Sequence, residues 1–498
     1  MSVAEELFGT PSYLVMDPVH GGIPFFDHER RVIDHPLFQR LRFILQNDVV
    51  FLVFPGATHS RFEHSIGSMH VAGRLFQSLV RTYLADPKRN RNGTMTERTR
   101  EAVQYFGTCF RLAALLHDVG HAPFSHQFEI ADMPKRLLAD EATASSLWPE
   151  NSWKPYYSRR PQSLTHEHYS VWGSHKILSD VFGGEKSTTI PLDVIALLET
   201  TDCYPSEKFA NYAKDFLQPF LRPGADTKAI SNRELAGHIQ RFLRYLISGE
   251  LDVDKMDYLL RDSFFSGCRY GMYNLDHLLS TLRVGFDLEN GWLGLAITQK
   301  GLGPLEDFVN ARFQLYLQLY SHKTVVGFKW LLKQAIAEIL SEAENEAELR
   351  TALTQHQDFA LFTDAFFWEA FRVFSRKQAA SACARLLRRD RLRYLRSERD
   401  LSSLKKKQEI SKLRKTGCEV ASWESEAKFS NISGTYENLK LLVENRVANT
   451  RELDDIKRHT DFFYKFRNTV VTHFFVDPLP ERSLLVPKEK GPSQRLSK

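Results

Sequence analysis

Three short segments of the sequence combine histidine and aspartate in a pattern that could hold a metal ion. One histidine lies in RFEHS (61–65), an adjacent His-Asp pair lies in LLHDVGHAPFSH (115–126), and a further aspartate lies in LDVDKMDYLLRD (251–262). Imidazole nitrogens and carboxylate oxygens together suit a divalent cation with octahedral or near-octahedral geometry. The predicted ligands are His64, His117, Asp118 and Asp254.

The surroundings of the His-Asp pair favour a metal site over a chance cluster. The pair follows the apolar segment 101–116, which predicts a buried helix that ends at Gly120. Burying polar groups without compensation costs roughly 1–3 kcal/mol each, and more for charges. A single histidine on an apolar helix is usually a hydrogen-bonded core residue, so the prediction rests on the ordered set. Fe, Mn, Zn, Ni or Co would fit these ligands, and Mg could accompany the substrate phosphates.

Helices must position most of these side chains. Apolar residues recur at three- and four-residue steps through most of the chain, whereas residues 139–165 lack periodicity and predict a long surface loop. Turn-rich residues before position 35 and an Asn-Gly pair at 290–291 predict small hairpins. The predicted helices cover 37–46, 64–84, 101–120, 166–182, 191–200, 207–221, 232–248, 252–262 and a pair over 303–348.

A strongly basic segment marks the C-terminal part of the chain. Between Arg372 and Lys415 there are 16 Lys or Arg residues and four acidic residues. As a helix, this segment would present an apolar stripe and a cationic face, which suits a solvated surface, nucleotide phosphates or subunit packing, or single-stranded nucleic acid. We expect a catalytic core over 1–345, a helical basic region over 346–477 and a flexible tail over 478–498.

Length and composition exclude several classes of protein. The 498 residues are 43% hydrophobic and 26% charged, which is typical of a globular chain and excludes a disordered or fibrous one. The net charge of +5 does not by itself imply a nucleic-acid partner. The five cysteines are scattered without a CxxC pair, which argues against a disulfide framework. Since no signal-peptide pattern or long apolar run is visible, we expect a cytoplasmic protein with no membrane partner.

The ordered histidine and aspartate segments resemble the signature of the HD-domain metal-dependent phosphohydrolases. Further segments are similar to the catalytic core of the sterile-alpha-motif and HD-domain-containing dNTP triphosphohydrolases and their bacterial relatives: DPVHGGIPF (17–25), IDHPLFQRLRFILQ (33–46), FPGATHSRFEHSIG (54–67), THEHYS (165–170) and YSHK (320–323). The resemblance covers residues 10 to about 345. It implies a mainly α, irregular helical HD-domain fold with small β-hairpin elements and a helical C-terminal region. Because no sterile-alpha-motif segment precedes the core, a stand-alone, bacterial-type member is the closer likeness.

The resemblance also implies roles for individual residues in the active site. His121, His126 and His166 match positions that act in proton transfer or water positioning at the phosphate. The positions that match phosphate contacts are Arg61, Lys255 and Arg312, and those that match sugar contacts are Gln46, Tyr258, Asp262 and Tyr320.

Other positions bear on regulation and selectivity. Asp34, Gln39 and Arg42 match part of a guanine-nucleotide activator site between subunits, where guanine offers paired donors and acceptors. The positions that differ from that activator pattern are Tyr13, Met16 and Thr298. In the active site, Tyr316 replaces the usual histidine and Asn47 replaces an apolar residue, so base and sugar selectivity could differ too.

The function that the resemblance implies is metal-dependent hydrolysis of a dNTP to deoxynucleoside and intact triphosphate. Such an enzyme would lower deoxynucleotide pools, for example in phage defence, and would work as a dimer or tetramer, with or without an activating nucleotide. The alternative is an HD-domain phosphodiesterase or nuclease acting on single-stranded nucleic acid or a signalling nucleotide, which the basic segment 372–415 favours. A nucleotide-sensing protein with a residual metal site is disfavoured, because all four predicted ligands are present.

Overall fold

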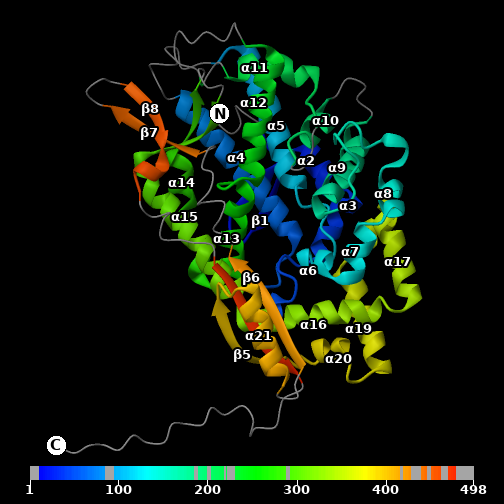
Figure 1. The fold of residues 1–498 in the computed structure, drawn as a ribbon. Coiled ribbons are helices and arrows are strands. Elements are labelled where there is room, and N and C mark those ends of the chain that lie inside the picture. The colour runs from blue at the N-terminus through cyan, green and yellow to red at the C-terminus, as the bar shows by residue number, and fades with distance from the viewer. Residues whose placement is uncertain are drawn as a thin grey trace, which may run out of the picture.

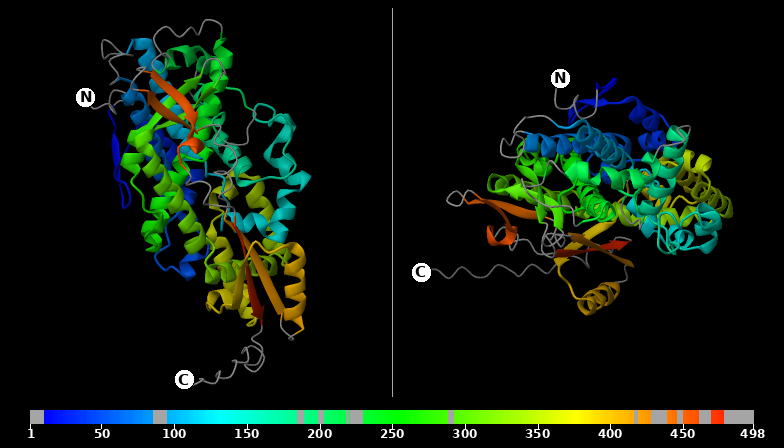
Figure 2. Two further views of the ribbon diagram at one scale, coloured as in Figure 1. Left: turned by 60° about the vertical axis from the view of Figure 1, so that its left-hand side comes forward. Right: turned by 90° about the horizontal axis from the view of Figure 1, so that it is seen from above.

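Helices form the body of the molecule, and small sheets lie at its edges (Figure 1). The structure is a computed structural model, and it confirms the mainly α fold expected from the sequence. The residues that it describes are 10–84, 95–183, 189–198, 203–217, 220, 230–287, 292–415, 419–427, 439–445, 450–460 and 469–477. Figure 2 shows the helical body from two further sides, with the β5-β9-β6 sheet beside α21 at one end.

Three helices deliver the histidines and aspartates of the sequence motifs to one place. α4 (Arg61–Leu84) packs along α5 (Glu97–Leu116), and α13 (Val253–Ser266) packs against α4. The Asp252 side chain caps α13 by accepting a hydrogen bond of 2.7 Å from the Lys255 backbone N–H. α5 ends at Leu116, so the expectation that it continues to Gly120 is wrong, and His117 and Asp118 lie in the turn that follows.

The other helices surround this centre. The predicted helices over 166–182 and 232–248 are confirmed at both ends. The remaining α-helices are α2 (Asp27–Ile33), α3 (Pro36–Gln39), α6 (His126–Ile130), α7 (Asp132–Leu138), α8 (Glu141–Leu147), α9 (His166–Phe182), α10 (Ile190–Ile195), α11 (Glu207–Leu217), α12 (Asn232–Ser248), α14 (Leu275–Thr281), α15 (Leu302–Leu315), α16 (Lys323–Ile339), α17 (Ala343–Thr354), α18 (His356–Leu361), α19 (Asp364–Lys377), α20 (Ala382–Leu387) and α21 (Ser403–Arg414). A π-helical turn over Tyr316–Tyr320 follows α15.

Two further local predictions are wrong. The expected helix over 37–46 ends early: α3 passes into a 3₁₀ turn over Arg40–Phe43, and Ile44 is extended. The backbone there bonds to the first residue of α4, with Arg61 N–H donating to the Ile44 carbonyl at 2.9 Å. The expected surface loop over 139–165 contains α8 and buries Trp148, which removes its large aromatic surface from water.

The two predicted hairpins are present. β1 (Tyr13–Asp17) pairs antiparallel with β2 (Gly21–Phe25), and β3 (Leu282–Asp287) pairs antiparallel with β4 (Trp292–Thr298). The Asn-Gly turn expected at 290–291 lies outside the described residues. β3 and β4 belong to a sheet of order β3-β4-β7-β8, which β7 (Leu439–Asn445) and β8 (Thr450–Asp455) complete.

The sequence predicts a helical region over 346–477, and this prediction is wrong for part of the region. α17 to α20 are helical, but a sheet of order β5-β9-β6 follows, built from β5 (Arg393–Arg399), β6 (Glu419–Ala427) and β9 (Thr469–Asp477). The basic segment is therefore divided among the end of α19, α20, β5 and α21, with a positive φ at Arg389 and at Asp400 on either side of β5. Pairing with the apolar strand β9 outweighs the local helical pattern. The predicted tail over 478–498 lies outside the described residues.

Among the helices that the structure describes, none combines the length and the hydropathy needed to cross a lipid bilayer.

Candidate active site

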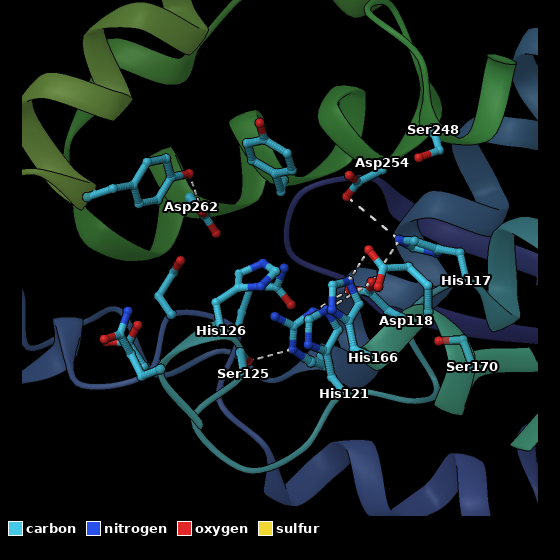
Figure 3. A pocket seen from close by; sticks show the side chains of 18 of the residues that line it. His117, Asp118, His121, Ser125, His126, His166, Ser170, Ser248, Asp254 and Asp262 are labelled. Carbon is cyan, nitrogen blue, oxygen red and sulfur yellow. Dashed lines mark hydrogen bonds and ion pairs between the residues drawn. The ribbon is translucent and has the colours of Figure 1, made fainter. Parts of the chain in front are cut away.

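The four predicted metal ligands meet where α4 and α13 begin and α5 ends. Figure 3 shows three of them, His117, Asp118 and Asp254. His64 Nε2 lies 3.0 Å from Asp254 Oδ1 and 3.7 Å from Asp118 Oδ2. His117 Nε2 lies 3.4 Å from Asp118 Oδ1 and 3.7 Å from Asp254 Oδ1. The two imidazole nitrogens and two carboxylates from three separate segments therefore face one another.

The donor set fits a divalent metal. The Nε2 atoms of His64 and His117 are buried and make no well-aligned hydrogen bond, whereas the Nδ1 atoms bond to Asp257 and to the Ala114 carbonyl, each at 2.8 Å. A ring whose Nδ1–H donates to an oxygen presents its Nε2 lone pair to a metal. Burial disfavours a charged His64, but the nearby carboxylates of Asp254 and Asp257 outweigh it and raise its pKa to about 10. The carboxylates thus favour a cation at this point.

Asp257 fixes the orientation of His64 from behind. It is fully buried, and its two oxygens receive Arg261 Nε and Nη2 at 2.9 Å each, in addition to His64. His20 Nε2 lies 2.7 Å from Asp257 Oδ1. Gly67 is required on α4 because a Cβ there would lie 2.0 Å from Asp257 Oδ1. Burial would raise the pKa of Asp257, but Arg261 and the two histidines hold it well below its usual range.

Arg61 connects the metal site to the following loop. Its Nε donates to Ser125 Oγ at 2.8 Å, and its Nη1 pairs with the Asp118 carboxylate. Burial would raise the pKa of Asp118, but His117 and Arg61 hold it well below its usual range. The guanidinium is therefore a charged donor directly beside the predicted metal, as a phosphate contact requires.

The three histidines predicted to act at the phosphate also come together. The rings of His121 and His166 stack with centroids 3.9 Å apart, and His126 lies edge-on to both at 5.1 and 5.0 Å. Two features bring them close. A Cβ on Gly120 would lie 2.0 Å from the Ser170 backbone nitrogen, so only glycine lets this loop approach α9. Phe124 and Ser125 have positive φ values of 56° and 54°, which turns His126 back toward the group.

Glu129 controls the charge of this histidine group. Its Oε1 lies 2.9 Å from His166 Nδ1, and its Oε2 lies 3.7 Å from His126 Nδ1. Burial disfavours a charged His166, but the bond to Glu129 outweighs it and raises the pKa of His166. Burial and the nearby Arg61 lower the pKa of His121 well below its usual value. The surroundings thus favour the protonated form of His166 and the neutral form of His121, whose rings stack on each other.

A pocket of about 420 Å³ connects these groups to the predicted sugar contacts. Tyr258, Asp262 and Tyr320 line it together with Gln46, and Figure 3 shows Asp262 across the pocket from His117 and Asp254. Asp262 accepts a hydrogen bond from the Tyr320 hydroxyl and lies 2.7 Å from His59 Nε2. Tyr316 and Tyr320 come from the π-helical turn, a distortion often found at functional sites.

Two predicted phosphate contacts lie outside this lining. Lys255 Nζ donates to the Gly249 carbonyl at 2.9 Å and pairs with the Asp252 carboxylate. Arg312 is near enough to Tyr258 to lower the pKa of that phenol, although burial raises it overall. Their contacts with phosphate stay predictions.

The predicted activator residues lie apart from the pocket. Arg42 Nε donates to Gln39 Oε1 at 2.8 Å, and the Arg42 guanidinium lies 3.4 Å from the centre of the Phe62 ring. Asp34 pairs with Arg30 at 3.0 Å. Binding of an activating nucleotide at these residues stays a prediction.

Sequence reasoning missed several residues of the site. Glu129 and Asp257 each lie three positions after a predicted functional residue, His126 and Asp254, so helical spacing could have indicated them. Asp48 and Lys329 also line the pocket, and no sequence pattern singles them out.

A comparison with protein families finds a match over the segment that holds three of the predicted metal ligands. The HD domain family matches residues 61–146, the segment that contains His64, His117 and Asp118. The chain therefore contains an HD domain.

Individual proteins related to this chain include enzymes named for their reaction. Deoxynucleoside triphosphate triphosphohydrolase SAMHD1 of Bos taurus is 30% identical over 370 residues, covering 72% of this chain and 53% of that protein. The protein of the same name from Homo sapiens is 27% identical over 365 residues, covering 72% and 50%. An uncharacterized protein of Methanocaldococcus jannaschii is 28% identical over 329 residues, covering 66% and 50%. The chain thus spans about half the length of the curated relatives it matches.

Solved structures share the fold over nearly the whole chain. A hypothetical protein from Aquifex aeolicus has a TM-score of 0.58 at 22% identity, covering 93% of this chain and 96% of that one. A phosphohydrolase from Bacteroides thetaiotaomicron has a TM-score of 0.59 at 20% identity, covering 93% and 99%.

Proposed function

We propose that this protein is a metal-dependent dNTP triphosphohydrolase that releases deoxynucleoside and intact triphosphate. The observation that carries the proposal is one pocket that is lined at one side by His117, Asp118, Asp254, Arg61 and the three histidines, and at the other by Tyr258, Asp262 and Tyr320. The fourth predicted ligand, His64, contacts Asp254 directly behind this lining. The relatives named as dNTP triphosphohydrolases support this substrate class. A role in lowering deoxynucleotide pools, as in phage defence, would follow from such turnover.

The chain's own residues suit hydrolysis at the α-phosphorus. A divalent metal, when bound to His64, His117, Asp118 and Asp254, lowers the pKa of a water and polarises a phosphoryl oxygen. Arg61 would hold the phosphate oxygens beside that centre, since its guanidinium already pairs with Asp118. The water oxygen forms a bond to the α-phosphorus as the bond to the sugar oxygen breaks. His166, whose pKa the Glu129 carboxylate raises, is the donor that would protonate the leaving oxygen, directly or through His126.

Product analysis tests the proposal. The metal-loaded protein is incubated with each dNTP, and the products are separated by anion-exchange chromatography, with Asp254→Ala as the inactive control. Equal amounts of deoxynucleoside and triphosphate are expected from the wild type. Release of pyrophosphate or single phosphates, or turnover that survives in Asp254→Ala, would overturn the proposal.

A second candidate is a phosphodiesterase or nuclease that acts on single-stranded nucleic acid. It is favoured by α21, where Lys407, Arg414 and Lys415 border a shallow hollow on an exposed helix. Shortening of a labelled oligonucleotide in the presence of untouched dNTPs would support this candidate over the first.

A further inference from the structure

His59 lies behind the side of the pocket that would receive the sugar. It comes two residues before α4, is 2% exposed and is not among the residues that line the pocket. Its side chain contacts Asp262 and its backbone contacts Gln46, both of which line the pocket and are predicted sugar contacts. A single buried residue therefore holds two groups that would meet the nucleoside.

The imidazole of His59 holds the carboxylate of Asp262. Its Nε2 lies 2.7 Å from Asp262 Oδ1, and the two side chains are 0% and 2% exposed. The other carboxylate oxygen, Oδ2, accepts a hydrogen bond from the Tyr320 hydroxyl. Because each oxygen has its own partner, the carboxylate cannot rotate without losing a hydrogen bond.

The surroundings of the His59 ring decide which nitrogen carries the proton. Nδ1 is buried and has no hydrogen-bond partner in the described part of the chain. A proton on Nδ1 would be a buried donor without an acceptor, which is unfavourable. The proton therefore lies on Nε2, which donates to Asp262. The ring also stacks on Phe265, with centroids 4.7 Å apart and an interplanar angle of 24°, and this contact fixes its plane.

The backbone around His59 is fixed as well. The His59 carbonyl accepts a hydrogen bond of 3.0 Å from the Gln46 N–H. A Cβ on Gly56 would lie 2.4 Å from the Phe265 carbonyl oxygen, so only glycine lets this segment approach the end of α13. The close approach allows His59 to reach Asp262 on the same helix while its backbone holds Gln46.

The hydrogen bonds to Asp262 determine what this side of the pocket can bind. Tyr320 lines the pocket and is partly exposed, and its hydroxyl donates its only proton to Asp262. Toward a ligand, the phenol oxygen can therefore only accept a hydrogen bond, and the carboxylate oxygens likewise only accept. A sugar hydroxyl suits this surface because it can donate, whereas a hydrogen atom in its place cannot.

We infer that His59 is a positioning residue for sugar recognition: it orients Asp262, and through it the Tyr320 hydroxyl, and so sets the selectivity for a nucleotide with a free 3′-hydroxyl. The inference rests on the proposed function, which supplies the substrate class, and adds a residue that acts on selectivity from behind the pocket. His59 itself does not touch the substrate. A site built to bond a substrate hydroxyl discriminates strongly against the analogue that lacks it.

The test compares dATP with 2′,3′-dideoxyATP on the metal-loaded protein, using kcat/KM for triphosphate release. The wild type is expected to favour dATP by roughly tenfold or more. His59→Leu removes the donor to Asp262, and it is expected to lose most of this preference through a raised KM for dATP, with the metal content unchanged. His59→Gln is expected to retain most of the preference, because its amide N–H can take the place of Nε2–H.

A matched control separates this role from a general effect on the fold. His277→Leu replaces an exposed histidine on α14 and is expected to leave the preference unchanged. Should His59→Leu not fold, as judged by circular dichroism, His59→Asn takes its place, because the shorter amide ends before the position of Nε2. A wild type without preference for dATP, or His59 variants that slow both nucleotides by the same factor, would overturn the inference.

A binding measurement distinguishes failure of this inference from failure of the proposed function. Dissociation constants of nonhydrolysable analogues of dATP and dideoxyATP are measured by calorimetry for the wild type, His59→Leu and His59→Gln. If no dNTP is hydrolysed, the proposed function fails, yet tighter binding of the analogue with the 3′-hydroxyl, lost in His59→Leu and kept in His59→Gln, would still support the role of His59. Equal binding of the two analogues by the wild type would overturn it.

Discussion

His64 and Asp257 are joined by a hydrogen bond of 2.8 Å between Nδ1 and Oδ2, and both side chains are fully buried. This bond decides which imidazole nitrogen of His64 is free to face Asp118 and Asp254. Asp257 is itself held by Arg261 and His20, and Arg261 Nη1 donates to Asp17 Oδ2 at 2.7 Å at the end of β1. The N-terminal hairpin is therefore part of the support of the predicted metal site.

Replacing Asp257 should weaken metal binding although Asp257 is not a ligand. In Asp257→Asn the negative acceptor is lost, so His64 is less firmly oriented and less basic. Loss of such a supporting group typically costs about 10–100-fold in metal affinity. Competition with a chelator measures the metal dissociation constant, with the exposed Asp276→Asn on α14 as the matched control. A folded Asp257→Asn variant with wild-type metal affinity would contradict the assigned role.

Removing a predicted ligand should abolish turnover and leave the fold largely intact. Asp254→Ala and His117→Ala each delete one of four donors at the edge of the pocket, where both side chains are partly accessible. Metal content by elemental analysis is expected to fall, while the circular dichroism spectrum stays close to that of the wild type. Unchanged turnover in either variant would exclude the residue as a ligand.

Substitution of Glu129 or His166 should change kcat without releasing the metal. Glu129→Gln removes the charge that raises the pKa of His166, so the imidazole loses its proton at lower pH. The limb of the pH–kcat profile that reports a protonated acid is expected to move to lower pH, and His166→Ala is expected to lower kcat by about 10²–10⁴. A loss of metal that parallels the loss of activity would show instead that the pair holds the metal.

Asp364 should make stability depend on pH. It is 5% exposed, and burial raises its pKa to about 6. The native state therefore binds the proton more tightly than the unfolded chain, so the free energy of unfolding falls as pH rises from about 4 to about 6. The full effect of this group is about 3 kcal/mol.

The contribution of Asp364 to the pH dependence of stability is measured by urea unfolding of the wild type and of Asp364→Asn at pH 4.5 and 6.5. The stability of the wild type relative to the variant is expected to decrease toward the higher pH, whereas the exposed Asp390→Asn should follow the wild type. A difference between wild type and Asp364→Asn that is the same at both pH values would show that Asp364 titrates normally.

The sequence predicted the long helices well because they depend on local pattern, and the same local pattern singled out the four residues that the structure brings together as candidate metal ligands. α9 and α12 carry continuous helical periodicity, and the His-Asp pair stands at a helix end. The segment 37–46 has the same periodicity but leaves the helix at Ile44, because its backbone bonds to the distant Arg61 N–H. β5 likewise depends on β9, more than 60 residues later in the sequence. Lys329 meets Asp48 through such long-range packing, which no local pattern encodes.

The position of bond cleavage tests the central claim most directly. The metal-loaded protein hydrolyses a dNTP in ¹⁸O-labelled water, and mass spectrometry locates the label in the products. Attack on the α-phosphorus predicts one ¹⁸O atom in the released triphosphate and none in the deoxynucleoside. Label in the deoxynucleoside, or only in single phosphates or pyrophosphate, would contradict a triphosphohydrolase acting through this site.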